Sequence, residues 1–222
     1  MTQFPQPAAV IFDMDGLIFD TETLYRRALQ SLARDRDLAA IDEDFCNATV
    51  GRPWLGTRAL LAQRLGGTAQ ADAFRIDWLD TYHALTESEL TLKIGVLELL
   101  ARLDELGIAR AIATGSERAL AHGYLAGHGL LDRFAAIVAA EDYTKGKPAP
   151  EPFLQAAQAL GVAPENCWAL EDSPNGVHAA HAAGMVTIMV PDLIAPSAEI
   201  AAKCHMVAPD LLAVRALLAP ST

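Results

Sequence analysis

The chain has 222 residues, of which 52% are hydrophobic, and a formal net charge of −11 at pH 7. A chain of this length and composition can bury a full core without disulfides or a structural metal. Its acidity argues against nucleic-acid binding, which needs a basic face. Because the sequence has no run of about 18 apolar residues, it also predicts no membrane-spanning helix. We therefore expect a globular protein that binds neither nucleic acid nor a membrane.

The cysteines and the first residues indicate the cellular compartment. Cys46, Cys167 and Cys204 are far apart and form no CxxC pair, so neither a disulfide framework nor a zinc site is predicted. The opening residues, MTQFPQP, lack the basic start and apolar stretch of a signal peptide. These features predict a cytoplasmic protein. We also expect a monomer or a small homo-oligomer.

Five short apolar runs have the length of buried strands. They cover residues 8–12, 108–113, 135–140, 167–170 and 186–190. Helical patterns lie between most of them, such as Leu99, Leu100 and Leu103 before the second run. This alternation predicts an α/β fold in which helices flank both faces of a parallel sheet. Ligands of such a sheet bind at the carboxyl ends of its strands.

The interval between the first two runs is far longer than the roughly 30 residues that a strand-helix-strand unit needs. Within it, apolar residues such as Leu24, Ala28 and Leu32 recur at helical spacing, and glycines such as Gly51 and Gly56 mark breaks between helices. We predict that residues 21–89 form a small all-helical cap domain. It is inserted into a core domain made of residues 1–20 and 90–222.

Two carboxylates, Asp13 and Asp15, directly follow the first predicted strand in the segment FDMDG. Like charges this close disfavour joint ionisation, so either a cation or hydrogen bonds compensate them, or one carboxyl group is protonated. Both possibilities indicate that these carboxyl groups take part in a chemical reaction. A solvated turn is the alternative interpretation, because Asp and Gly are common in turns.

Two further segments offer groups that could hold a phosphate. Thr114 and Gly115 follow the second run, where a hydroxyl and backbone N–H groups can donate to phosphate oxygens; helix capping is the alternative. Lys147, in KGKPAPE, precedes a proline that restricts its backbone. A fixed ammonium group can neutralise a phosphoryl group, although a lone lysine can also be a solvated surface charge.

Glu171 and Asp172 follow the fourth run, in the segment LEDSPNG. Carboxylate oxygens from here and from the first strand suit Mg2+, which prefers carboxylates, waters and phosphate oxygens. The alternative is a purely structural role, in which these residues cap the helix that starts near Pro174. Such a role is compatible with metal binding. All of these segments are predicted to lie at the carboxyl ends of strands.

Together, these segments resemble the four motifs of the haloacid dehalogenase (HAD) superfamily. The resemblance rests on Asp13, Asp15, Gly16, Thr114, Lys147, Glu171 and Asp172. It covers nearly the whole chain and implies a Rossmann-like core. Residues 14–22, MDGLIFDTE, look like the branch with a small helical cap, which contains sugar-phosphate phosphatases and β-phosphoglucomutase.

The resemblance implies a role for each motif residue. Asp13 would attack phosphorus and form an aspartyl-phosphate, and Asp15 would protonate the leaving oxygen and then activate water. Thr114 and Lys147 would hold the phosphoryl oxygens, with Gly115 adding a backbone donor. Members of the superfamily that attack carbon generally lack an acid at the position of Asp15, so phosphoryl transfer is favoured over dehalogenation.

The resemblance also implies a Mg2+ ion. Its ligands would be the Asp13 carboxylate, the main-chain carbonyl of Asp15 and Asp172, with Glu171 assisting directly or through water. In the predicted cap, Arg52 resembles an arginine that contacts the non-reacting part of the substrate; the alternative, which the residue alone favours, is a surface arginine.

We therefore predict a Mg2+-dependent phosphatase for a small phosphorylated metabolite, such as a sugar phosphate or a nucleotide. One alternative is a hexose-phosphate mutase resembling β-phosphoglucomutase. Tyr25 argues against it, because it stands where the mutase has a histidine that assists acid-base chemistry. The other alternative is a non-catalytic metabolite-binding module.

Overall fold

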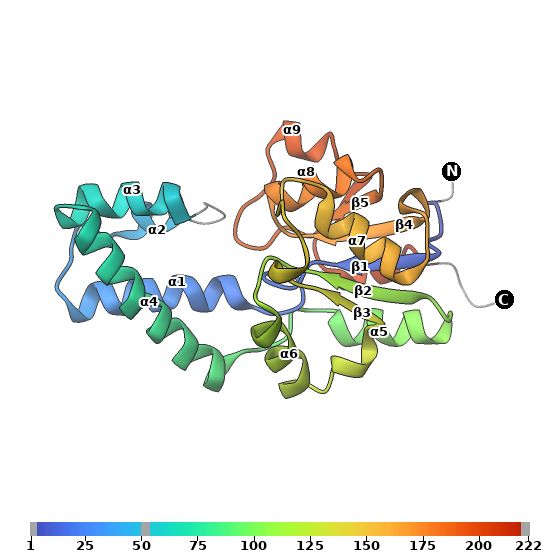
Figure 1. Ribbon diagram of the computed structural model, residues 1–222, viewed down its shortest axis with the longest axis horizontal. Helices are drawn as coiled ribbons and strands as arrows, with labels where there is room; N and C mark the ends of the chain where they lie inside the picture. Colours follow the sequence, from blue (N-terminus) through green and yellow to red (C-terminus); the bar gives the residue numbers. More distant parts are fainter. Residues whose placement is uncertain (1–3, 50–53, 219–222) are drawn as a thin grey trace. The chain divides into compact units, whose positions relative to one another are not determined.

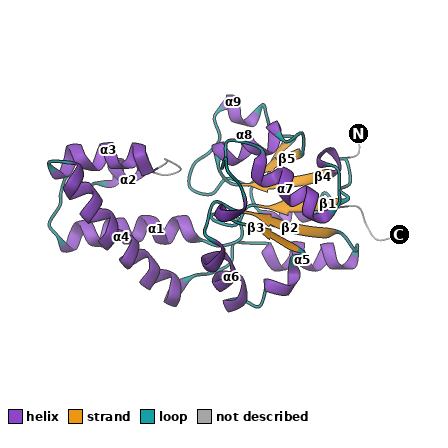
Figure 2. Cartoon of the chain, viewed as in Figure 1, coloured by secondary structure: helices purple, strands orange, loops and turns teal. Residues whose placement is uncertain are grey.

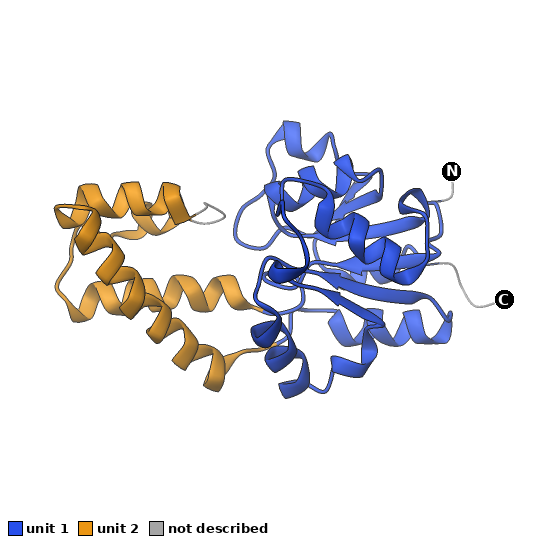
Figure 3. Cartoon of the chain, in the orientation of Figure 1, with its two compact units in different colours: residues 1–19, 92–222 blue, residues 20–91 orange. Residues whose placement is uncertain are grey.

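The computed structural model describes residues 4–49 and 54–218 (Figure 1). The chain divides into two compact units (Figure 3). Residues 1–19 and 92–222 make up the first, which we call the sheet unit, and residues 20–91 make up the second, which we call the helical unit. That residues 21–89 act as a cap domain stays a prediction.

In the described residues, the sheet unit contains one sheet of six parallel strands in the order β3-β2-β1-β4-β5-β6. The strands are β1 (Ala9–Phe12), β2 (Ala109–Ala113), β3 (Ala136–Val138), β4 (Cys167–Glu171), β5 (Val186–Met189) and β6 (Met206–Val207). The first strand in the chain is central, with Ile11 opposite Ala111 on one side and Ala169 on the other. The predicted parallel sheet is confirmed.

Helices flank this sheet (Figure 2). They are α5 (Val96–Glu105), α6 (Arg118–Gly127), α7 (Glu151–Leu160), α8 (Pro174–Ala182), α9 (Ala198–Ala201) and α10 (Leu211–Arg215), with 3-10 turns η1 (Leu131–Arg133), η2 (Ala140–Asp142) and η3 (Pro164–Asn166). Alternate strand residues point to one face, so Ile11 and Ala111 join a buried cluster with Ala156 of α7 and Ala179 of α8. Small side chains at these positions let the helices pack closely on the sheet.

The helical unit contains α1 (Thr21–Asp35), α2 (Glu43–Thr49), α3 (Trp54–Leu65) and α4 (Thr68–Glu89). Its core includes Leu24 and Ala28 of α1 and Phe74 and Trp78 of α4. The Trp78 ring stacks on Tyr25 with centroids 4.3 Å apart, and its indole N–H donates to the Tyr25 carbonyl at 2.9 Å. The helical spacing of apolar residues therefore produced a helix pair with its own core.

Within residues 4–49 and 54–218, no helix has the length and apolar character needed to cross a bilayer.

Candidate active site

The carboxyl ends of the central strands gather the predicted site residues of the sheet unit. Asp13 directly follows β1, and its N–H continues the ladder by donating to the Leu170 carbonyl at 2.9 Å. Thr114 directly follows β2 and donates in the same way to Val138 at 2.9 Å. Glu171 is the last residue of β4. Because the strands are parallel and adjacent, their terminal side chains meet at one edge.

Lys147 joins two of these strand ends. Its Nζ atom donates to Asp13 Oδ1 and to Glu171 Oε1. The three side chains are only 11%, 9% and 1% exposed, in the order Lys147, Asp13, Glu171. One ammonium group is thus shared by two carboxylates that are largely removed from water.

The loop that carries Lys147 is held at both of its ends. Before the lysine, the N–H groups of Thr144 and Lys145 both donate to the Glu151 carboxylate at 2.9 Å. After it, the peptide bond to Pro148 is cis, and Ala149 N donates to the Gly146 carbonyl at 3.0 Å. The hydrogen bonds hold the backbone from which the long lysine side chain reaches the strand ends.

Burial and neighbouring charges have opposite effects on the pKa values of Asp13 and Lys147. Burial raises the pKa of Asp13 to about 8, and it outweighs the effect of Lys147, which lowers that pKa. Burial disfavours the charge on Lys147, but the carboxylates of Asp13 and Glu171 favour it more, so the pKa of the lysine is raised. The charged form of the lysine is therefore favoured, while burial opposes the charged form of Asp13, which a further positive charge nearby would favour.

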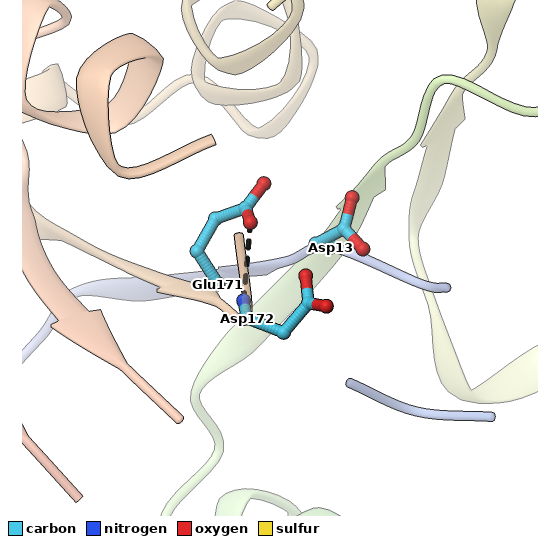
Figure 4. Close-up of side chains that lie close together, drawn as sticks. All are labelled: Asp13, Glu171 and Asp172. Carbon is cyan, nitrogen blue, oxygen red and sulfur yellow. Dashed lines mark hydrogen bonds between the residues drawn. The ribbon is translucent and has the colours of Figure 1, made fainter. Parts of the chain in front are cut away.

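An oxygen-rich cluster beside the lysine fits such a cation. Asp13, Glu171 and Asp172 each offer a carboxylate oxygen, and these atoms lie within 4.8 Å of one another (Figure 4). A set of hard oxygen donors suits a divalent ion such as Mg2+. The Asp172 carboxylate also packs against Gly16, where a Cβ atom would lie 2.3 Å from Asp172 Oδ2 and the backbone has φ +77°. A larger residue at position 16 would displace this candidate ligand.

The two acidic residues after β4 have different surroundings. Glu171 Oε2 accepts three hydrogen bonds, from Asp172 N at 3.1 Å, from Ser173 N at 3.1 Å and from Ser173 Oγ at 3.0 Å. Since its other oxygen accepts from Lys147, Glu171 is already well satisfied by the protein. The donor set therefore favours Asp13 and Asp172 as direct ligands, with Glu171 organising the loop and the lysine.

Asp15 is half-buried and is contacted by two hydroxyl groups. Its Oδ2 atom accepts from Ser116 Oγ at 2.7 Å and from Thr114 Oγ1 at 3.2 Å. Thr114 is fully buried, whereas Gly115 next to it is exposed. The predicted phosphate-binding hydroxyl thus lies against the predicted acid-base residue.

Most of the predicted site residues are brought together. Asp13, Lys147 and Glu171 are in contact, Asp15 contacts Thr114, and Asp172 belongs to the acidic cluster. Gly115 adjoins Thr114 on the exposed side of the same loop. Arg52, the predicted substrate residue of the cap, lies outside the described residues.

Two side chains at this edge were not predicted as site residues. Ser116 bonds to Asp15, and the Tyr143 hydroxyl donates to the Thr114 carbonyl at 3.0 Å. Ser116 stands in the same short motif as Thr114, so its position in the motif was a usable signal. Tyr143 lies four residues before Lys147 and offers no such signal, because only the folded chain brings it to β2.

Farther along the edge, Lys93 forms an ion pair with Asp192, with Nζ and Oδ1 2.6 Å apart. A Cβ atom at Gly16 would lie 3.3 Å from Asp192 Oδ2, so this carboxylate faces the same glycine as Asp172. The acidic surroundings of the candidate metal centre therefore extend beyond the predicted motifs.

Comparison with known proteins identifies relatives across nearly the whole chain. A fructose-1-phosphate phosphatase of Escherichia coli (strain K12) is 35% identical over 192 residues, covering 82% of this chain and 96% of the relative. The chloroplastic protein Suppressor of Quenching 1 of Arabidopsis thaliana is also 35% identical over 195 residues, which cover 82% of this chain. The match spans only 18% of the length of that protein.

Solved structures share the fold. A HAD family hydrolase from Deinococcus radiodurans, solved with bound phosphate and sodium, is 28% identical with a TM-score of 0.79, covering 98% of this chain and 100% of the other. A β-phosphoglucomutase from Clostridium difficile is 25% identical with a TM-score of 0.71, covering 93% and 92%. Residues 7–184 match the family model of the haloacid dehalogenase-like hydrolases. The chain therefore belongs to the haloacid dehalogenase-like hydrolase family.

Proposed function

We propose that the chain is a Mg2+-dependent phosphatase that hydrolyses a small phosphomonoester, such as a sugar phosphate, a nucleotide or a related metabolite. The observation that carries the proposal is the shared ammonium group of Lys147 between the buried carboxylates of Asp13 and Glu171. The phosphatase relative in Escherichia coli and the phosphate bound in the related structure from Deinococcus radiodurans support it.

In the first step, a carboxylate oxygen of Asp13 attacks phosphorus. A bond forms between that oxygen and phosphorus, and the ester bond to the leaving oxygen breaks. Asp15 gives its proton to the leaving oxygen, so the product is a neutral alcohol. Lys147 is suited to neutralise the transferring group because its charge is fixed beside Asp13.

In the second step, the Asp15 carboxylate takes a proton from water. The water oxygen attacks phosphorus, and the bond to Asp13 breaks. Inorganic phosphate leaves, the Asp13 carboxylate is restored, and Asp15 again holds the proton that the next cycle needs. Thr114, with the backbone of Gly115, would hold phosphoryl oxygens in both steps.

The metal would be held by the Asp13 and Asp172 carboxylates and the main-chain carbonyl of Asp15, with Glu171 assisting directly or through water. The 4.8 Å cluster of carboxylate oxygens supports this assignment. Bound Mg2+ would supply charge that offsets the phosphoryl oxygens and favours the ionised form of Asp13.

Substrate choice would lie in residues 21–89, which we propose to act as the cap domain, with Arg52 contacting the non-reacting part of the substrate. The partner is then a small phosphorylated metabolite. The spacing of the cysteines supports action in a reducing cytoplasm. The proposed assembly is a monomer or a small homo-oligomer.

The proposal is tested with a panel of phosphate esters, assayed for released phosphate with Mg2+ and after chelation. We expect the wild-type enzyme to release phosphate only with the metal, and Asp13→Asn to release none above background. If Asp13→Asn turned over like wild type, the nucleophile would be wrongly assigned. Release that survives chelation would remove the metal from the proposal.

A hexose-phosphate mutase is the second candidate, because the β-phosphoglucomutase structure shares the fold. Tyr25 weakens it. The ring of Tyr25 packs against Trp78 and Tyr82, and burial raises the pKa of its hydroxyl to about 12, so it is a poor acid-base group near neutral pH. Supplied with β-glucose 1-phosphate and its bisphosphate, a mutase forms glucose 6-phosphate, and a phosphatase forms free phosphate. Ligand binding without metal or turnover across the panel would instead indicate a non-catalytic module.

A further inference from the structure

We propose that Ser116 is a positioning residue that holds the Asp15 carboxylate in the orientation needed for proton transfer. The proposal rests on the role proposed above for Asp15 and concerns a residue to which the resemblance to the superfamily assigned no role. The bond from Ser116 Oγ to Asp15 Oδ2 is 2.7 Å long, the usual length of a well-formed hydroxyl hydrogen bond.

The serine is itself held by its backbone. Ser116 N donates to Thr114 Oγ1 at 3.0 Å, and the Ser116 carbonyl accepts from Ala140 N at 3.0 Å. The first bond closes a tight turn after β2, and the second ties this turn to η2, which follows β3. A hydroxyl on a backbone fixed at two points can hold a partner with little loss of side-chain freedom.

The two hydroxyls on Asp15 Oδ2 are not equivalent. Thr114 Oγ1 is 3.2 Å away, against 2.7 Å for Ser116, so the serine makes the stronger bond. A threonine hydroxyl also has a single proton to donate. When Thr114 turns that proton to a phosphoryl oxygen, as its proposed role requires, Ser116 is the hydroxyl that still restrains Asp15.

The restraint matters because the terminal torsion of an aspartate is broad and roughly two-fold. A carboxylate without a directional partner samples many planes, and proton transfer needs one of them, with the donor within hydrogen-bond reach of the reacting oxygen. Ser116 restrains the plane by donating to one oxygen, Oδ2. The serine would therefore affect the rate of both proton transfers, rather than the binding of phosphate or metal.

The test compares Ser116→Ala with Ser116→Thr, which keeps a hydroxyl. Ser197→Ala is the control, because it removes a serine hydroxyl outside the site. The Ser197 hydroxyl caps α9 by accepting a hydrogen bond from Ile200 N. For each protein, kcat and KM are measured, with Mg2+ and inorganic phosphate affinities from calorimetry. Circular dichroism and thermal melts check that each variant is folded.

We expect Ser116→Ala to lower kcat by roughly 10- to 100-fold, which is part of the 10²- to 10⁴-fold that acid-base catalysis contributes. Mg2+ and phosphate affinities should stay within about twofold of wild type. Ser116→Thr should recover most of kcat, and Ser197→Ala should keep all of it. A raised KM with unchanged kcat would overturn the proposal and make Ser116 a substrate ligand; unchanged kcat and KM would overturn it outright.

Crystal structures of wild type and Ser116→Ala separate this proposal from the proposed function, since they need no turnover. We expect the Asp15 carboxylate plane to rotate by more than about 30° or to become disordered without the serine hydroxyl. An unchanged, well-ordered carboxylate would overturn the positioning role even in an active phosphatase. If wild type released no phosphate from any ester, the proposed function would fail, and the positioning role would fall with it.

Discussion

The carboxyl edge of the sheet and the helical unit both contain ion pairs, but they bury them to different degrees. At the edge, the side chains of Lys147 and Glu171 are 11% and 1% exposed. In the helical unit, Arg36 and Asp77 are 41% and 43% exposed. The first pair belongs to a cluster of convergent charges, whereas the second joins two helices at their surface.

The difference distinguishes the charged residues of the proposed active site from charged residues on a surface. Removing charged groups from water is costly, and a buried pair persists only where geometry compensates for it. An exposed pair costs little and contributes little, because water and salt screen it. An ion pair therefore indicates a possible active site in one region and only a surface contact in the other. Four measurements can test this comparison.

The largest effect is expected for Lys147→Met. It leaves the buried carboxylates of Asp13 and Glu171 without their shared ammonium group. We expect kcat/KM for a phosphate ester to fall by about 10³-fold, because one fixed charge at the transferring group is lost. Lys145→Met is the matched control, since that lysine is exposed two residues away and should keep full activity. Equal losses in both variants would show that burial does not distinguish the two lysines.

Next in size is the effect of Asp172→Asn on metal binding. The substitution keeps the shape of the side chain but removes the charge from one oxygen donor of the acidic cluster. Titration calorimetry should give an Mg2+ affinity at least about tenfold weaker than wild type. Asp132→Asn, at an exposed position in η1, should leave the affinity unchanged. Wild-type affinity in Asp172→Asn would remove Asp172 from the metal site.

A smaller effect is expected from the Arg36 and Asp77 pair of the helical unit. In a double-mutant cycle with Arg36→Ala and Asp77→Ala, the coupling free energy from urea unfolding should be about 0.5 kcal/mol. The cycle also corrects for the contact between Arg36 and the Phe74 ring, 5.7 Å from its centroid. A coupling above about 2 kcal/mol would contradict the claim that exposed pairs contribute little here.

The smallest effect concerns Glu151, a half-buried residue at the start of α7. Hydrogen bonds from Thr144 N and Lys145 N hold the pKa of Glu151 below its usual value. A carboxylate with a lowered folded-state pKa stabilises the protein above its unfolded pKa of about 4.3, and this is lost as pH falls through the folded-state value. Thermal melts of wild type and Glu151→Gln should differ slightly at pH 6 and converge near pH 3. A gap that does not change with pH would exclude this contribution.

The sequence predicted most of the sheet because buried parallel strands are short, continuous apolar runs. The run at 8–12 became β1 over Ala9–Phe12, and the run at 135–140 became the shorter β3 over Ala136–Val138. It did not predict β6, Met206–Val207, because a partly exposed strand of two residues leaves no apolar run.

The site was predictable where side chains follow strands and unpredictable where they meet through loops. Asp13 and Glu171 stand at the ends of adjacent strands, so topology alone brings them together. The bond between Ser116 and Asp15 joins residues 101 positions apart and depends on the turn after β2. Tyr143 reaches the Thr114 carbonyl only because its loop folds back toward β2. The nearness of Ser116 to Thr114 in the sequence was a signal for its place in the site, but neither contact could be predicted from the pattern of residue types.

The central place of β1 has a consequence for how the chain gains activity as it is synthesised. β1 is the first strand to be synthesised, but its two neighbours in the sheet, β2 and β4, come much later in the sequence. Asp13 precedes Lys147 by 134 residues. The helical unit, in contrast, is one continuous segment whose contacts can form as it leaves the ribosome. Regain of turnover in a refolding experiment would therefore time the docking of β4, the last strand that the site requires.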